Sequence, residues 1–157
     1  MVVASIDAKF ITDVASVRVA LETLAAKTIA TGSDGAAKEV VEQAWQAYQE
    51  AHGTQNPERL HEAHLELHRS IWFASENNLP KRIWSTMEAQ IGAAIGVDED
   101  ARADPERALH LHEQLIHAIL GGDPDVIAAE VERHTEASAD ELVHMITERD
   151  LSGMPSP

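Results

Sequence analysis

The sequence contains no cysteine and no long apolar run, and each absence excludes a class of protein. Without cysteine, its 157 residues form neither disulfide bonds nor thiolate ligands for a metal ion. No apolar run reaches the length that spans a bilayer, and the N-terminus lacks the charged-then-apolar pattern of a signal peptide. We therefore expect a cytoplasmic protein that does not enter a membrane.

Basic residues are scarce as well. Twelve Lys and Arg stand against 27 Asp and Glu, so the formal net charge is −15 at pH 7. An acidic surface of this kind repels phosphate backbones, and no local cluster of Lys or Arg compensates for it. We expect that this chain does not bind DNA or RNA by itself.

Aromatic residues are rare, whereas histidine is abundant. The chain has one Tyr and two Phe but nine His. Apolar residues make up 44% of the chain, which indicates one globular domain of ordinary size rather than a disordered segment. Histidine is therefore the residue type that we expect to carry the chemistry.

The sequence pattern is helical throughout. Ala, Leu, Glu and Gln dominate, and Gly, Pro, Asn and Asp gather in five short clusters. These clusters leave six predicted helices, at about 12–30, 36–51, 57–76, 80–95, 105–120 and 124–149. Asn56, Asp104 and Asp123 each precede a proline and are typical caps of helix N-termini. The pattern predicts an all-α antiparallel bundle of six to seven helices, with flexible ends at 1–11 and 150–157.

Four histidines on three of these helices are predicted to lie at one level of the bundle. In an up-and-down bundle, the turns after the third and fifth helices lie at the same end, and each residue adds about 1.5 Å of depth. His68 lies ten residues before the middle of the first turn, and His112 and His134 lie eleven residues from the middle of the second. His64 lies one helical turn deeper than His68.

Two interpretations of this arrangement stay open. A single histidine on an apolar helix face is usually a hydrogen-bonded core residue. Four neutral imidazoles at one level compete for few acceptors, whereas a bound cation accepts a lone pair from each ring. His52, His110 and His144 are expected at the solvated surface instead.

Five stretches of the sequence form a distinctive set in this order: VRVALETLAAKTIA at 17–30, HLELH at 64–68, HRSIWFASENN at 68–78, HEQLIHAILGGD at 112–123 and AAEVERH at 128–134. Together they resemble the FCD domain, which is the C-terminal effector-binding and dimerisation module of the FadR branch of GntR-type bacterial transcription regulators. The resemblance covers about residues 12 to 148.

This resemblance implies a metal site. In metal-binding members, the ligands are an Asp and a His four residues apart and two further His, and these positions fall on His64, His68, His112 and His134. The Asp position is occupied by His64, a departure that favours zinc, with nickel as the alternative, over harder cations. His64 is then either a fourth ligand or a close neighbour of the metal.

The resemblance also implies a pocket for a small organic acid, its effector. Arg18 and Glu22 fall in the same layer of the bundle by residue counting, and Arg18 would hold the carboxylate of the ligand. An ion pair between Arg18 and Glu22 is an equal alternative. Asn77 is a candidate donor in the pocket, although a helix C-cap is the favoured interpretation of this residue.

Three functions follow from these residues. The first is a metal-dependent effector-binding and homodimerisation domain of a GntR/FadR-type transcription regulator. The alternative is a stand-alone metalloenzyme that uses a His-ligated metal as a Lewis acid on a small carboxylate, with Glu22 or a spare histidine as general base. The third is an acidic adaptor that dimerises with regulators of its own family.

Two expectations concern the rest of the protein. Nothing before residue 12 provides the winged-helix domain of such regulators, so we expect either an effector domain cut from a longer regulator or a protein without a DNA-binding part. We also expect a homodimer, because Trp45, Trp72 and Trp84 exceed what one small bundle needs to bury.

Overall fold

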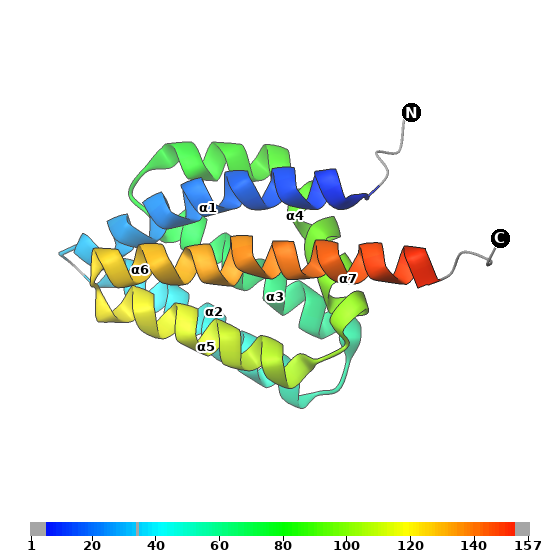
Figure 1. Ribbon diagram of the computed structural model, residues 1–157. Coiled ribbons are helices and arrows are strands. Elements are labelled where there is room, and N and C mark those ends of the chain that lie inside the picture. The colour runs from blue at the N-terminus through cyan, green and yellow to red at the C-terminus, as the bar shows by residue number, and fades with distance from the viewer. Residues whose placement is uncertain (1–5, 34, 153–157) are drawn as a thin grey trace.

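A computed structural model confirms the predicted all-α fold and describes residues 6–33 and 35–152, with side chains up to residue 149. The helices are α1 (Ala8–Thr31), α2 (Ala36–Gly53), α3 (Pro57–Ala74), α4 (Asn78–Arg102), α5 (Pro105–Gly121), α6 (Pro124–Val131) and α7 (Ser138–Ser152), and the π-helical turn η1 (Glu132–Ala137) joins the last two into one continuous rod (Figure 1). The described part contains no strand. None of its helices is both long enough and apolar enough to cross a membrane.

Capping residues start the helices where the sequence predicted them. Asn56, Asp104 and Asp123 each accept hydrogen bonds from backbone N–H groups of the first turn, and a proline follows each of them. α5 ends at Gly122, whose φ of 82° is accessible to glycine without strain. Its N–H donates to the carbonyl of Ala118, which closes the helix before the next cap begins.

Both ends of the chain are more helical than the sequence predicted. α1 begins at Ala8, inside the predicted flexible segment 1–11, because Asp7 caps it. α7 runs to Ser152, inside the predicted flexible tail 150–157. Two parts of these predicted flexible ends lie outside the described residues: 1–5 and 153–157.

α4 is longer than predicted at both ends. It spans Asn78–Arg102 instead of 80–95, so most of the connection predicted between the helices 80–95 and 105–120 is helical. The prediction of a C-cap at Asn77 was wrong, because its side chain accepts a hydrogen bond from the N–H of Leu79 and is the N-cap of α4.

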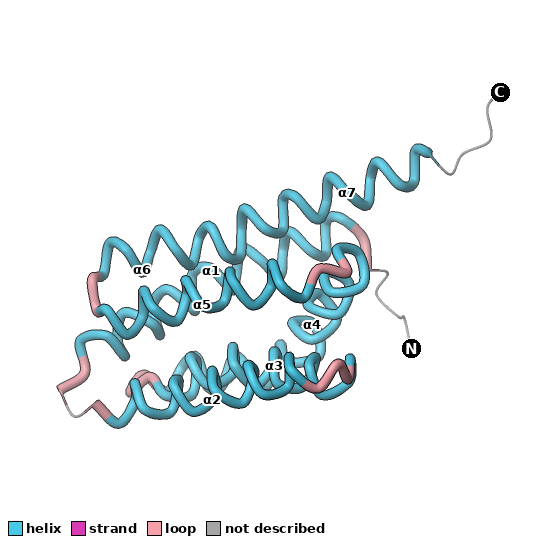
Figure 2. Tube along the Cα trace, turned by 90° about the horizontal axis from the view of Figure 1, so that it is seen from below, coloured by secondary structure: helices cyan, strands magenta, loops and turns pink. Residues whose placement is uncertain are grey.

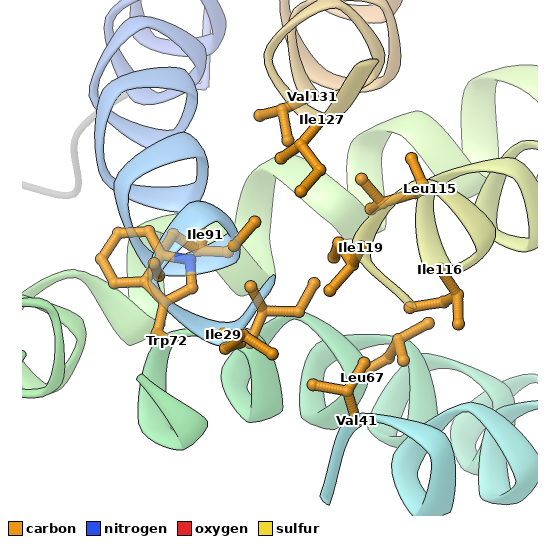
Figure 3. Close-up of a cluster of buried hydrophobic side chains, with 14 of the residues drawn as sticks. Ile29, Val41, Leu67, Trp72, Ile91, Leu115, Ile116, Ile119, Ile127 and Val131 are labelled. Atoms are coloured by element: carbon orange, nitrogen blue, oxygen red, sulfur yellow. The ribbon is translucent and has the colours of Figure 1, made fainter. Parts of the chain in front are cut away.

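The helices pack in two layers, and α1 contacts helices of both. Figure 2 shows α2 and α3 on one side, and α1, α5 and the α6–α7 rod on the other. α1 contacts every other described helix. Figure 3 shows Ile29 of α1 in the main core, surrounded by side chains from α2, α3, α4, α5 and α6. The central helix therefore places its own side chains where the two layers meet.

The tryptophans do not provide the dimer surface that the sequence suggested. Trp72 and Trp84 are at most 1% exposed, and their rings pack edge to face with centroids 5.2 Å apart. Trp45 is half-buried and stacks on Tyr48 at 5.8 Å. A single bundle buries most of this aromatic surface by itself, so the tryptophans do not support the expected homodimer.

The extension of α4 is held in place by Arg102. Its guanidinium donates to Asp98 Oδ1 at 2.5 Å on the same helix, and to the Ser138 carbonyl at 2.6 Å and Glu141 Oε2 at 3.0 Å on α7. Tertiary hydrogen bonds of this kind stabilise a helix end that an acidic sequence would otherwise leave frayed.

We expect Arg102→Ala to lower the free energy of unfolding by about 2 kcal/mol, because several partly buried acceptors lose their donor at once. Urea unfolding followed by circular dichroism measures the change. The matched control is Arg82→Ala on the exposed face of the same helix, which should change stability by less than about 0.5 kcal/mol. Equal effects of the two substitutions would contradict the role given to Arg102.

Candidate metal centre

Four helical segments bring polar side chains to one buried layer. They belong to residues that are each at most 9% exposed: Arg18 and Glu22 from α1, His64 and His68 from α3, His112 from α5 and His134 from η1. Residue counting predicted this layer, and the structure places all six residues in it. A hydrophobic core seldom contains so many polar groups, so their hydrogen bonds decide what the layer can do.

His68 is oriented by Glu22. Its Nδ1 lies 2.5 Å from Oε1 of Glu22. Burial opposes ionisation of Glu22, but Arg18 and then His68 outweigh it and lower the pKa of this carboxyl to about 2. The carboxylate therefore accepts, and Nδ1 carries the hydrogen. Burial also lowers the pKa of His68 to about 4, although Glu22 acts against this shift. The ring is neutral at pH 7, and its Nε2 presents a lone pair.

His112 is fixed in the same tautomer by the backbone. Its Nδ1 donates to the carbonyl oxygen of Ala108 at 2.6 Å. Burial, followed by the neighbouring imidazoles of His134, His64 and His68, lowers the pKa of His112 well below its usual value. This ring is also neutral at pH 7, so its Nε2 presents a second lone pair.

These two lone pairs face each other. Nε2 of His68 and Nε2 of His112 lie 3.2 Å apart, and neither nitrogen carries a hydrogen that could join them. Tetrahedral zinc with Zn–N bonds of about 2.0–2.1 Å holds neighbouring ligand nitrogens about 3.3 Å apart. The separation therefore fits two ligands of one cation and is unfavourable without a positive charge between the rings.

His64 completes a group of three. Its Nδ1 lies 2.7 Å from Oε1 of Glu99, and its ring meets that of His112 edge to face with centroids 4.4 Å apart. Burial opposes ionisation of Glu99, but the hydrogen bond from His64 and that from His61 lower its pKa. Potential ligand atoms of His64, His68 and His112 all lie within 4.8 Å of one another.

His134 lies beside the converging group of three histidines and not within it. The sequence put His134 among three main ligands and left His64 as a fourth ligand or a neighbour. In the structure, His134 packs against His112 and His68, with ring centroids 4.4 and 5.4 Å away, but does not join the converging group of three. Its Nδ1 is buried and has no hydrogen-bond partner among the described residues.

The π-helical turn η1 explains the position of His134. A π-turn adds a residue to the helical turn and changes the faces of the residues after it. Two adjacent residues, His134 and Thr135, are therefore buried, and the hydroxyl of Thr135 also has no partner in the described structure. The stretch 128–134 reads as an ordinary α-helix, so the sequence alone did not predict this turn.

A cavity of about 880 Å³ opens onto the histidines. Arg18 lies on its wall, with Nε 3.3 Å from Oε2 of Glu22 and Nη2 3.2 Å from Nδ1 of His68. Because Nδ1 of His68 carries a hydrogen, the anionic partner of this guanidinium is Glu22. The ion pair, one of the two alternatives for Arg18, is thus formed, and Arg18 also lines the cavity.

The remaining predicted residues lie elsewhere or differ in burial. Asn77 caps α4 and is not among the described residues that line the cavity, so its predicted effector contact has no support in this structure. The side chains of His110 and His144 are exposed, as predicted. His52 is half-buried at the cavity wall, with Nε2 3.6 Å from Oε1 of Glu106, so its predicted solvated position was wrong.

Three residues of the site were missed by the sequence argument. The ring of Tyr48 is tilted against that of His112, with centroids 5.0 Å apart, and burial, with Glu99 nearby, raises the pKa of its hydroxyl. Glu99 lies in the connection predicted between the helices 80–95 and 105–120. His61 lies three residues before His64, and this helical spacing was the one signal that could have placed it beside the site.

Comparison with known families agrees with the geometry. A family model described as the FCD domain matches residues 13–137, which include all four buried histidines. Comparison with curated proteins gives no match. FCD domains are the effector-binding domains of GntR-type regulators. Since the match covers most of the chain, this protein belongs to the FCD domain family.

Proposed function

We propose that this chain is a metal-dependent effector-binding domain of a GntR/FadR-type transcription regulator. His64, His68 and His112 would hold one divalent transition metal, and His134, which lies next to this group, is the candidate for a fourth ligand. The observation that carries the proposal is the pair of Nε2 lone pairs 3.2 Å apart, each fixed by a hydrogen bond at Nδ1, at the wall of a cavity.

The ligand atoms favour zinc, with nickel as the alternative. All the converging donors are imidazole nitrogens, which suit zinc, nickel and copper better than magnesium or manganese. When bound, such a metal would supply a Lewis acid that coordinates an oxygen of a ligand. Each ring donates its other N–H to a carboxylate or carbonyl, the usual support of a metal-binding histidine.

A small organic acid is the effector that this site suits. Arg18 faces the cavity, and its guanidinium has more N–H groups than its contact with Glu22 uses. A carboxylate could then place one oxygen on Arg18 and another at the metal. Glu22, the candidate general base of an enzyme, is already engaged by His68 and Arg18, which favours binding over catalysis.

Metal analysis tests the core of the proposal. Protein purified without a histidine tag should take up one zinc ion per chain, and zinc at 100 times its Kd should stabilise the fold by about 2.7 kcal/mol. His112→Ala should lose both effects because it removes a converging ligand. His110→Ala is the control on the same helix, where the side chain is 65% exposed, and should behave as wild type. Equal loss of zinc in both variants would contradict the site.

The effector prediction is tested with the zinc-loaded protein. Thermal-shift assays with a panel of small carboxylates and the matching alcohols should give stabilisation by carboxylates alone. Arg18→Gln should weaken this binding about tenfold or more, because a charge-assisted hydrogen bond is lost. Arg107→Gln, at another arginine of the cavity wall, is the control. Equal stabilisation by the alcohols would contradict the role of Arg18.

A homodimer is part of this proposal, and an exposed apolar stripe on α1 supports it. Val17, Ala20 and Leu24 form an exposed apolar stripe on the outer face of this helix, where Val17 is 38% and Leu24 45% exposed. Sedimentation should give a dimer at micromolar concentration, and Leu24→Glu should shift it to a monomer. Val126→Glu, at an exposed residue of α6, should leave the dimer intact. A wild-type monomer would contradict the proposal.

A further inference from the structure

Glu99 binds two histidines at once. Its Oε1 accepts from Nδ1 of His64 and its Oε2 accepts from Nδ1 of His61, each at 2.7 Å. Both histidines lie on α3, one helical turn apart, whereas Glu99 lies on the extended end of α4. One carboxylate therefore joins the two helices at the edge of the buried layer.

The hydrogen bond to His64 determines which nitrogen faces the other histidines. With its hydrogen on Nδ1, a neutral His64 keeps its lone pair on Nε2. The group of His64, His68 and His112 then has the same pattern throughout, with an acceptor behind each ring: Glu99, Glu22 and the carbonyl of Ala108. Without Glu99, both tautomers and other ring orientations of His64 would compete.

His61 holds Glu99 in turn. A glutamate side chain has three rotatable bonds and loses considerable entropy when it is fixed. The bond from His61 uses the oxygen that His64 does not, and the Glu99 side chain is 26% exposed. The carboxylate is thus held from both sides, and Oε1 stays directed at His64.

Charge gives the second part of the argument. All the converging ligands are histidines, and histidine binds a metal as a neutral imidazole, so the ligands themselves bring no negative charge to a divalent ion. Glu22 and Glu99 lie directly behind two of these rings. A carboxylate in this position makes the imidazole a stronger donor to a metal and partly balances the charge of the ion.

We propose that Glu99 is a positioning residue of the metal centre, because its hydrogen bond with His64 orients that ring to bind the metal. His61 holds Glu99 in place. This inference rests on the proposed metal site and adds to it two residues of the α3–α4 contact. It also assigns a function to the unexpected extension of α4: those turns bring a carboxylate to the site.

The alternative is that Glu99 only ties α4 to α3. The two roles differ in what they change. A purely structural contact would alter the stability of the metal-free protein and leave the affinity of the folded protein for metal unchanged. A positioning residue must alter metal affinity at a temperature where every variant is folded.

The experiment compares Glu99→Ala, Glu99→Gln, His61→Ala and the control Glu62→Ala, an exposed residue at the cavity wall. Zinc affinity is measured by chelator competition at a temperature where circular dichroism shows all variants folded. We expect Glu99→Ala to bind zinc about 10–100-fold more weakly than wild type. Glu99→Gln keeps an acceptor but not the charge, so its zinc affinity should lie between those of wild type and Glu99→Ala. His61→Ala should show a smaller loss, and Glu62→Ala none.

A second readout is the visible spectrum of the cobalt-loaded protein, which reports the coordination geometry. Glu99→Ala should change this spectrum in the same way as His64→Ala, since both remove the same ligand. Glu99→Ala with wild-type affinity and spectrum, while His112→Ala loses the metal, would overturn this inference alone. A wild-type protein that bound no zinc would overturn the proposed function together with this inference.

Discussion

The hydrogen on Nδ1 of His64, His68 and His112 is the constraint on which the site depends. A neutral imidazole has one donor and one acceptor, and burial makes an unsatisfied one costly. Glu22, Glu99 and the carbonyl of Ala108 each accept one of these hydrogens, from His68, His64 and His112 respectively. Each acceptor thus leaves the Nε2 lone pair of its ring free, and potential ligand atoms of the three rings lie within 4.8 Å of one another.

The fold supplies these acceptors from separate parts of the chain. Glu22 comes from the central helix α1, and Arg18 four residues earlier keeps it ionised in a buried position. Glu99 comes from the extended end of α4, which Arg102 fastens to α7. The carbonyl of Ala108 belongs to the same helix as its histidine. Helix packing and side-chain orientation are therefore parts of one arrangement, because a shift of α4 would move the partner of His64.

Much of this layer could be predicted from the sequence because depth in an up-and-down bundle is proportional to residue number. Counting placed His64, His68, His112 and His134 together without any knowledge of their partners. It could not find Glu99, because an acidic stretch with a glycine reads as a loop until the contacts of Arg102 are known. Nor could it rank the histidines, since that order depends on a π-helical turn and on ring orientations, not on spacing.

The charge of the whole protein and the charge at the site have opposite signs if the centre holds a divalent metal. The net charge of −15 repels an anion at a distance. At the metal centre itself, the metal and Arg18 would outweigh the carboxylates of Glu22 and Glu99, whereas further carboxylates, such as those of Glu62 and Glu106, line the same cavity. Screening over about 8 Å at physiological ionic strength weakens the outer repulsion before a ligand reaches the buried layer. Affinity for an organic acid would then depend on contacts inside the cavity, and the acidic exterior would slow entry without deciding which acid binds.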